Sequence, residues 1–435
     1  MTVNRRDFCK SSLTLAAAAG VASLVPGTLS CSNPNSKVVV GLIGCKGMGF
    51  SNLSRFMDQP DVEVAALCDV DENVLNKRAL DVEKRMGKKP DLYKDFRKLL
   101  ERKDIDAVII GTPDHWHCLP FVYACEAGKD VYVEKPIANS IGECMIMAKA
   151  ARKYNRVVQV GQWQRSGTHW QDAIDYVHSG KLGQIRTVKT WAVMSWLKPT
   201  PKQNTTVPAG VDYDFWLGPA PERPFNPNRF HFHFRWWWDY AGGLMTDWGV
   251  HLIDFALYGM NAARPNSIMA TGGNFSIDKA AMETPDTMTT IYEYDNFMLQ
   301  WEHAIGIDLG PYKRGHGVAF IGDNATLVVD RGGWEVMLEK AGKKAELVEV
   351  PRTKGDGKDH PKHVRDFLDC VKSRKTPKAS IEIGKNVAMV AQMGNLAYRA
   401  QSKIHWDEKN FKFDNELANS LIYPNYRAPW SLPKL

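Results

Sequence analysis

The sequence has few of the features that mark membrane, fibrous or nucleic-acid-binding proteins. After its first 30 residues, no stretch reaches the ~18 uncharged apolar residues that a membrane-spanning helix needs. There are no internal repeats, and no low-complexity segment beyond that leader. The formal net charge is +7, but Lys and Arg are scattered singly and form no basic stripe interleaved with aromatics. Nucleic acid is therefore not expected as a partner.

Cysteine pairs are also lacking. None of the eight cysteines forms a C-x-x-C or C-x-x-H pair of the kind that binds metal. Beyond Cys9 and Cys31, most lie in a strand–helix region where buried cysteine is common. These residues, which we expect to be free core thiols, are Cys45, Cys68, Cys118, Cys125, Cys144 and Cys370. His115 and His117 form an H-x-H, but with Asp114 as the only adjacent carboxylate no metal site is expected.

Charged residues open the chain, and a short apolar stretch follows. Residues 4–10 read Asn-Arg-Arg-Asp-Phe-Cys-Lys, and residues 11–22 are weakly apolar. This pattern resembles a twin-arginine (Tat) signal, which is an export address and not a membrane anchor. An ordinary secretion signal or a disordered tail is the alternative. We expect residues 1–36 to be signal and tether, and the protein to be periplasmic, or lipid-anchored at the cell envelope if Cys31 is modified.

A chain of 435 residues with 44% hydrophobic and 24% charged residues predicts a soluble protein of two domains. Residues 37–161 alternate buried-strand and helix patterns, which predicts an α/β fold with βαβ crossovers and a Rossmann dinucleotide-binding domain. The expected strands are 38–43, 64–68, 107–111, 130–133 and 157–161, and the expected helices are 51–59, 73–86, 95–102, 119–127 and 141–154.

The pattern changes after residue 161. Helix 168–178 and strand 185–195 precede a long loop, 198–230, that is rich in Pro, Asn and Thr. Segments of alternating character then mark residues 162–435 as an α+β substrate-binding domain with a large, mostly antiparallel sheet. Its further expected strands are 267–272, 288–294, 298–303, 317–322 and 325–330, and helix 385–401 is expected to return over a domain face or onto the first domain.

A glycine-rich turn joins the first strand to the first helix, where backbone N–H groups can meet a pyrophosphate. Asp69 ends the second strand, 25 residues beyond Gly44, where a carboxylate binds ribose hydroxyls. NAD is therefore the expected cofactor. Lys46 replaces the second glycine of the usual G-x-G-x-x-G pattern, and its ammonium suits a phosphate, which leaves NADP open. The expected contacts of the turn are Gly44, Lys46, Gly47, Met48 and Gly49.

Two further elements carry groups for acid–base chemistry. Lys135 follows strand 130–133, at the strand end where ligands bind in a doubly wound sheet, and a desolvated lysine there can hold or move a proton. Asp247 and His251 are spaced i, i+4, which places both on one helix face and suits a histidine acid/base beside a carboxylate. Taken singly, a strand-end lysine is more often a solvated charge, and a histidine in an apolar helix is more often a core residue.

Together and in this order, these motifs resemble the Gfo/Idh/MocA oxidoreductase family. The resemblance runs from about residue 37 to about residue 401 and includes the stretches 112–117 and 363–368. It implies that Lys135 lies beside the nicotinamide and polarises the reacting hydroxyl, that His251 is the acid/base, and that Asp247 contacts substrate. It also implies a homo-oligomer, dimer or tetramer, formed through the C-terminal sheet. The cofactor would be bordered by Thr112, Pro113, His117, Glu134 and Lys135.

Residues beyond the last Rossmann strand complete the predicted substrate site. Gln162, Trp163 and Arg165 point toward the same cleft in this interpretation. Residues 230–240 form an aromatic run in which Arg235 and Trp236 are expected ligand contacts, because aromatic faces stack on sugar rings. A core or oligomer-interface cluster is the alternative for this run.

Three functions are compatible with these residues. The first is an NAD(P)-dependent oxidoreductase acting on a hydroxyl of a sugar, cyclitol or glycoside; export would imply a retained and recycled cofactor. The second is a glycoside hydrolase that oxidises, eliminates, hydrates and reduces with recycled NAD. The third is a catalytically inactive carbohydrate-binding protein, which the presence of Lys135, Asp247 and His251 disfavours.

Overall fold

The structure is a computed structural model that describes residues 37–340 and 347–435. The predicted signal and tether, residues 1–36, and the lipidation site Cys31 lie outside the described residues. Within the described ranges, no helix is both long and apolar enough to cross a membrane.

The first sheet is parallel throughout, with the strand order β3-β2-β1-β4-β5-β6. This confirms the predicted doubly wound Rossmann fold. Strand β3 (Asp91–Tyr93), which follows the turn at Gly87, was not predicted. The strands are β1 Val38–Ile43, β2 Val62–Cys68, β3 Asp91–Tyr93, β4 Ala107–Ile110, β5 Asp130–Val133 and β6 Val158–Val160. The helices are α2 Met48–Met57, α3 Glu72–Met86, α4 Phe96–Leu100, α5 Cys118–Glu126 and α6 Ile141–Lys153.

Local sequence explains why these helices begin and end where they do. The Asp71 carboxylate accepts hydrogen bonds from two N–H groups at the start of α3, and Gly87 ends that helix in the left-handed region. Ser140 caps α6 and also binds Glu143, in a capping-box arrangement. Helix α2 begins at Met48, three residues before the predicted start at residue 51, because Gly47 already serves as its N-cap.

The second sheet is mixed but mostly antiparallel, as predicted, with the order β14-β13-β12-β11-β7-β10-β9-β8-β15-β16. Only the β7–β10 pair is parallel among the described pairings. Strands β13 to β16 were not predicted. The strands are β7 Ile185–Met194, β8 Ser267–Gly273, β9 Thr287–Glu293, β10 Met298–Ile305, β11 His316–Gly322, β12 Ala325–Asp330, β13 Gly333–Leu338, β14 Val350–Lys354, β15 Ile404–Asp407 and β16 Lys412–Phe413.

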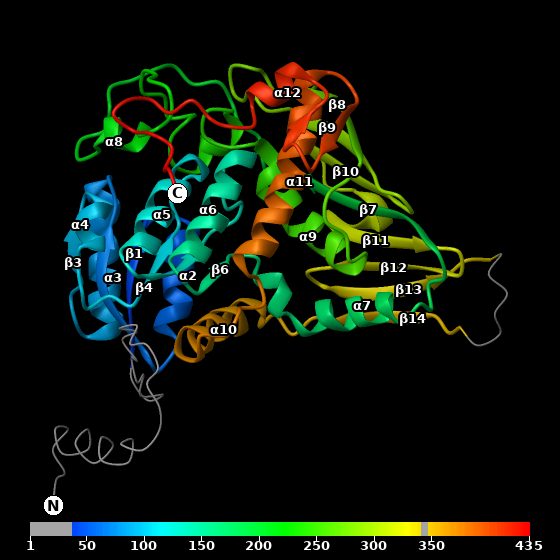
Figure 1. Cartoon of the computed structure of the whole chain (residues 1–435), viewed down its shortest axis with the longest axis horizontal. Helices are drawn as coiled ribbons and strands as arrows, with labels where there is room; N and C mark the ends of the chain where they lie inside the picture. Colours follow the sequence, from blue (N-terminus) through cyan, green and yellow to red (C-terminus); the bar gives the residue numbers. More distant parts are fainter. Residues whose placement is uncertain (1–36, 341–346) are drawn as a thin grey trace, which may run out of the picture. The chain divides into compact units, whose positions relative to one another are not determined.

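Helices from the C-terminal half return to the Rossmann sheet. Helix α10 (Asp359–Ser373) packs on α2, and α11 (Ile381–Ala400) runs between α6 and the second sheet, where it also contacts α9 (Val250–Gly259) (Figure 1). Residues 37–435 consequently form one compact unit. The predicted loop 198–230 contains a short helix, and the remaining helices are α7 Thr168–His178, α8 Tyr213–Leu217 and α12 Glu416–Ser420.

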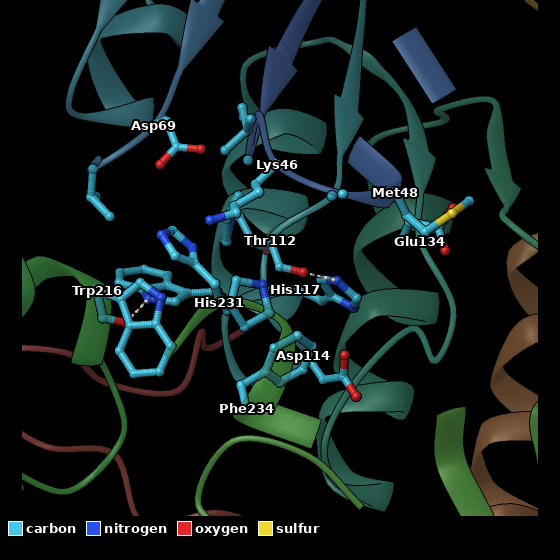
Figure 2. A pocket seen from close by; sticks show the side chains of 18 of the residues that line it. Lys46, Met48, Asp69, Thr112, Asp114, His117, Glu134, Trp216, His231 and Phe234 are labelled. Atoms are coloured by element: carbon cyan, nitrogen blue, oxygen red, sulfur yellow. Dashed lines mark hydrogen bonds between the residues drawn. The ribbon is translucent and has the colours of Figure 1, made fainter. Parts of the chain in front are cut away.

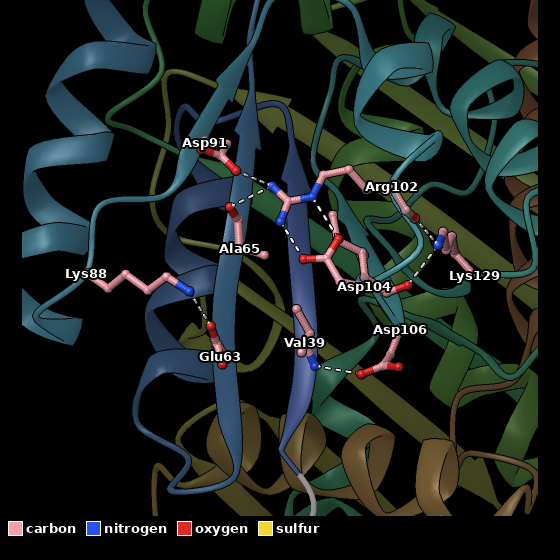
Figure 3. Close-up of polar contacts among 10 residues, drawn as sticks. Val39, Glu63, Ala65, Lys88, Asp91, Arg102, Asp104, Asp106 and Lys129 are labelled. Atoms are coloured by element: carbon pink, nitrogen blue, oxygen red, sulfur yellow. Dashed lines mark hydrogen bonds and ion pairs between the residues drawn. The ribbon is translucent and has the colours of Figure 1, made fainter. Parts of the chain in front are cut away.

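The amino ends of the Rossmann strands carry a set of paired surface charges (Figure 3). Arg102 binds the carboxylates of Asp91 and Asp104, and Asp106 accepts a hydrogen bond from the main chain of β1. Lys129, which lies just before β5, donates to the carbonyl oxygens of Arg102 and Ile105. Hydrogen-bonding capacity at this end is therefore used within the fold. The six cysteines of the described residues are free and buried, as predicted.

Candidate active site

A cavity of about 610 Å³ lies at the carboxyl ends of the Rossmann strands (Figure 2). One wall consists of residues that follow β1, β2, β4 and β5. The facing wall comes from residues 215–235 and Asp247, far away in the sequence. A site at the strand ends is where a doubly wound sheet binds its ligand. Ten predicted cofactor contacts line the cavity: Gly44, Lys46, Gly47, Met48, Asp69, Thr112, Pro113, His117, Glu134 and Lys135.

The glycine turn has the backbone geometry that a pyrophosphate needs. Gly47 has φ 55° at the N-cap of α2, and a Cβ there would meet no atom within 4 Å, so its cavity-facing side is open. Gly49 does not line the cavity. A Cβ on Gly49 would lie 2.0 Å from the Gly44 carbonyl oxygen, so this glycine allows the helix to approach the strand closely. The substitution by Lys46 leaves an exposed ammonium at the cavity mouth.

The Asp69 carboxylate holds the turn from the other side. Its oxygens accept hydrogen bonds from the backbone N–H groups of Cys45, at 2.7 Å, and Asp71, at 3.0 Å. Burial raises the pKa of Asp69 to about 6, and these two N–H donors limit the rise. No cation pairs with this carboxylate among the residues described. Its remaining capacity to accept hydrogen bonds fits the ribose hydroxyls of NAD.

Aromatic side chains form a further part of the cavity wall. The ring of Phe215 stacks on Phe96 with centroids 6.3 Å apart, and the Trp216 carbonyl accepts a 2.8 Å hydrogen bond from the Trp116 indole. His231 lies in the same wall and contacts Asp71 at 2.9 Å. Sequence reasoning missed this wall because the short helix α8 sits in what reads as an irregular loop.

Glu134 and His117 brace the cavity from behind. Glu134 is buried and accepts a 2.7 Å hydrogen bond from the Asn52 amide, and burial raises its pKa. The His117 ring nitrogens lie 2.7 Å from the Pro136 carbonyl oxygen and 2.8 Å from that of Thr112. Burial lowers the pKa of His117 to about 4, so its ring is uncharged at neutral pH. Both side chains border the cavity while their polar atoms are largely engaged by the protein.

Lys135 and Asp247 meet at the end of the cavity. The Lys135 ammonium donates to the Asp247 carboxylate at 2.8 Å and to its carbonyl oxygen at 2.6 Å. Arg235 lies 3.3 Å from the same carboxylate. Burial alone would raise the pKa of Asp247, but Lys135 and Arg235 together hold it well below its usual range. A charged lysine is thereby fixed between the cofactor cavity and the helix that carries His251.

The spacing of Asp247 and His251 predicts that both stand on one regular α-helix, but the structure differs. Residues Met245–Gly249 form a π-helical turn, and α9 begins at Val250. No hydrogen bond joins the two side chains. Neither ring nitrogen of His251 bonds to a described residue, and its Nδ1 is buried. Burial, reinforced by Lys135, lowers the pKa of His251 well below its usual value, so the imidazole is neutral and able to accept a proton.

The other predicted substrate residues separate into two groups. Trp163 is half-buried with its ring centroid 6.1 Å from that of His251, and Gln162 is buried with an unbonded Oε1. Arg165 instead forms a buried bidentate ion pair with Asp254, and Trp236 is a core residue with 1% exposure. None of these four residues lines the cavity. The aromatic run 230–240 is thus mainly core, and it reaches the cavity through His231, Phe232, Phe234 and Arg235.

Two side chains at this site were missed as ligand candidates. Asp114 lines the cavity, is 6% exposed, and its carboxyl makes no hydrogen bond with any described residue; in Figure 2 no dashed line reaches it. Arg331, in the turn between β12 and β13, lies between the rings of Trp163 and Trp248. Asp114 lies inside the stretch 112–117, which is part of the family resemblance. Arg331 has no local sequence signal, because its neighbours come from two distant segments.

Two family models match this chain. One is described as an oxidoreductase family with an NAD-binding Rossmann fold and matches residues 38–162. The other is the C-terminal α/β domain of that family and matches residues 159–298 and 340–432. Together they account for both sheets, and the first identifies NAD as the cofactor that the Rossmann domain binds.

Relatives and solved structures agree with this assignment. A glycosyl hydrolase family 109 protein of Shewanella baltica is 29% identical over 208 residues, 42% of this chain and 44% of the relative. An alpha-N-acetylgalactosaminidase of Shewanella oneidensis is 31% identical over 157 residues, 35% of this chain and 34% of that protein. The matches thus span less than half the length of these relatives.

The structure of levoglucosan dehydrogenase with NADH and L-sorbose has 18% identity and a TM-score of 0.65, over 85% of this chain and 99% of that one. The aldose-aldose oxidoreductase of Caulobacter crescentus has 19% identity and a TM-score of 0.63, with the same coverage. At these identities the likeness shows the shared fold. Because the family models match most of its length, the chain belongs to the Gfo/Idh/MocA family of NAD-binding oxidoreductases.

Proposed function

We propose that the protein is an NAD-dependent dehydrogenase that oxidises a hydroxyl of a sugar, cyclitol or glycoside. One observation carries the proposal: the Lys135 ammonium is fixed at the cavity by Asp247, and the neutral His251, which follows Asp247 by four residues and does not itself line the cavity, is near enough for Lys135 to lower its pKa. Bound NAD supplies the hydride acceptor. A sugar hydroxyl placed between these two side chains meets a donor for its oxygen and an acceptor for its proton.

The residues have separate roles in this proposal. Lys135 donates a hydrogen bond to the reacting oxygen, and Asp247 and Arg235 keep the lysine in place. His251 takes the hydroxyl proton, while the hydride leaves the same carbon for the nicotinamide ring. Asp247 also contacts the substrate. Trp163 packs beside His251 and helps to hold that ring in position.

We further propose that the cofactor stays with the protein between turnovers. Residues 209–212 pack against the start of α3: the backbone N–H of Glu72 donates to the Gly210 carbonyl at 2.9 Å, and the backbone N–H of Asp212 donates to the Val70 carbonyl at 3.0 Å. Helix α8 follows directly and brings Phe215 and Trp216 over the cavity. Dissociation of the cofactor would require these contacts to open. A retained cofactor needs a second substrate, or a later step of the same reaction, to return it to its starting state.

The second candidate is a glycoside hydrolase that uses NAD transiently, and the named Shewanella relatives favour it. Such an enzyme oxidises a sugar, eliminates the aglycone, adds water and reduces the product. The same pair of Lys135 and His251 serves its first and last steps. The two candidates differ in net chemistry and agree in cofactor.

The test uses the purified protein without added cofactor. Denaturation in urea at neutral pH should release about one NAD(H) per chain, identified by chromatography and by nicotinamide absorbance. Aryl glycosides are then supplied with and without a second carbonyl substrate. Turnover that needs the carbonyl acceptor supports the dehydrogenase, and aglycone release without it supports the hydrolase. Protein that neither contains nor binds NAD(H) would refute both.

Location and assembly are also proposals. The Tat-like leader suggests export, with the mature protein in the periplasm or held at the cell envelope by a lipid on Cys31. The broad sheet of the second domain suggests a homo-oligomer. Fractionation of cells that express the intact chain or a Cys31→Ser variant tests the first point. Sedimentation of the purified protein tests the second.

A further inference from the structure

Arg331 occupies an unusual place beside the proposed catalytic histidine. Its guanidinium carbon lies 4.6 Å from the ring centroid of Trp163 and 4.3 Å from that of Trp248. Both rings also flank His251, each with its centroid 6.1 Å from that of the imidazole. The two tryptophans therefore hold a cation next to the proposed base.

The charge of Arg331 is not balanced by a direct partner. Its Nε and Nη2 donate to the Gln164 side-chain oxygen at 3.3 and 3.2 Å, and it forms no ion pair with any residue in 37–340 or 347–435. Two other buried arginines differ from it: Arg165 is paired with Asp254, and Arg314 is paired with both Asp330 and Glu335. Burial lowers the pKa of Arg331 to about 10. Holding a half-buried guanidinium without a counter-ion is unfavourable.

One edge of this guanidinium remains available. Nη1 makes no hydrogen bond with a described residue and is not sealed from solvent. The nearest carboxylates, Asp247 and Asp359, act on Arg331 only at longer range. Asp247 is already shared by Lys135 and Arg235.

Arg331 therefore has no direct counter-ion among the described residues. Lys135 and Arg235 share the carboxylate of Asp247, whereas Arg331 meets Asp247 and Asp359 only at longer range. Asp114 makes no ion pair with Arg331, and burial raises the pKa of its carboxyl well above the usual value, which disfavours the charged form. An anionic substrate would complete this arrangement. A neutral substrate would have to displace water from Arg331 without supplying a charge.

We infer that Arg331 binds a carboxylate of the substrate, so that the protein acts on uronic acids or their glycosides in preference to neutral sugars. The inference rests on the proposed function. A guanidinium edge matches carboxylate geometry, and one unbalanced cation matches a monoanion. A phosphate ester, with a charge of about −1.5 to −2, would leave negative charge in excess. The tryptophan rings fix the guanidinium, so that little freedom is lost when it binds.

The experiment compares substrates that differ only at one carbon. The cofactor-loaded protein receives methyl glycosides of glucose, galactose and mannose, each with its matching uronic acid and its 6-phosphate. The readouts are kcat/KM with a carbonyl acceptor present, and saturable quenching of tryptophan fluorescence. Because Trp163 and Trp248 contact Arg331, binding is observable without turnover. At least one uronic acid should exceed its neutral partner by about 10- to 100-fold, the range of a charge-assisted hydrogen bond.

Three variants separate the role of Arg331 from general effects. Arg331→Gln should reduce the uronate-to-neutral ratio to near one, and Arg331→Lys should retain part of it. Arg186→Gln removes a cation from a side chain that is 73% exposed on β7, and should leave the ratio unchanged. Thermal melting of each variant checks folding. If Arg331→Gln does not fold, the uronate-to-neutral ratio measured for Arg331→Lys tests the inference instead.

The outcomes distinguish this inference from the proposed function. Equal use of neutral and acidic sugars, or an Arg331→Gln variant that keeps the preference, overturns the inference and leaves the dehydrogenase intact. A preference for the 6-phosphates overturns the choice of carboxylate. If no sugar is oxidised although NAD is bound, the proposed function fails. In that case, quenching of tryptophan fluorescence by uronates that is weaker in Arg331→Gln still supports a carboxylate site at Arg331. If uronates cause no quenching, the inference is overturned.

Discussion

The two ends of the Rossmann sheet use charged residues in opposite ways. At the amino ends, exposed carboxylates are matched with cations: Arg102 holds Asp91 and Asp104, and Lys88 holds Glu63 (Figure 3). At the carboxyl ends, Asp69 binds only main-chain N–H groups. Both ends are rich in ionisable groups, so composition alone does not distinguish them.

Burial and incomplete pairing mark the functional end. The shifted pKa of Asp69 and the unbonded carboxyl of Asp114 represent polar capacity that folding leaves for a ligand. Paired charges at the opposite end are screened by water and contribute little. We therefore expect the effect of a substitution on activity or stability to decrease from the reaction centre toward the solvent.

The largest effect is expected from Lys135, and β5 supplies a matched control because a lysine flanks each of its ends. Lys135→Met should lower kcat by about 10²–10⁴-fold, since the reacting oxygen loses its donor. NAD should remain bound, as shown by denaturation and chromatography. Lys129→Met removes an ammonium that binds only the Arg102 and Ile105 carbonyls, and should leave kcat unchanged. Equal losses in the two variants would contradict the assigned role.

Arg165 is a charge at the carboxyl end that is fully paired, so it should behave as a structural residue. Arg165→Met leaves Asp254, whose side chain is 1% exposed, without its partner, and should lower the free energy of unfolding by about 3–5 kcal/mol. Adding Asp254→Leu should recover much of this loss. Urea unfolding measures both variants. A stable Arg165→Met protein with impaired sugar oxidation would return Arg165 to the substrate site, where the sequence placed it.

The part of the site that could be predicted is the part encoded locally. The turn Gly44–Gly49, Asp69 and Lys135 follow buried strands directly, so strand periodicity fixes their position. The wall formed by Phe215 and Trp216 depends on how a long loop folds back, and no local pattern specifies that. The ion pair of Arg165 could not be predicted for the same reason: its partner lies 89 residues away.

Asp69 should make cofactor binding depend on pH. With a pKa of about 6, it is mostly protonated at pH 5 and mostly ionised at pH 7. Only the ionised form can accept hydrogen bonds from both the turn and the ribose. Affinity for NADH, measured by fluorescence on protein refilled after stripping, should therefore increase about tenfold from pH 5 to pH 7. Asp69→Asn should flatten this dependence. A pH profile that is the same in both proteins would contradict it.

The raised pKa of Asp69 also predicts that the stability of the protein without cofactor depends on pH, in the opposite direction to cofactor binding. Because the pKa of Asp69 is raised from 3.8 by folding, the folded state holds this proton more tightly than the unfolded state. The contribution of Asp69 to stability should therefore decline as the pH rises from about 4 to about 6. Unfolding of the stripped protein and of Asp69→Asn across this range measures the difference.

The smallest effect is expected at the amino end. Asp104 pairs with Arg102, but its side chain is 58% exposed, so Asp104→Asn should change the free energy of unfolding by less than about 1 kcal/mol and leave kcat unchanged. The hydrogen bond from Arg102 lowers the pKa of Asp104, so the small contribution is present above pH 4 and is lost as the pH falls through the folded pKa. It should also vanish in 1 M salt, because exposed pairs are screened. A loss comparable to that of Arg165→Met would mean that exposure does not separate the two ends, and that the structural and functional charges of this sheet must be distinguished by another property.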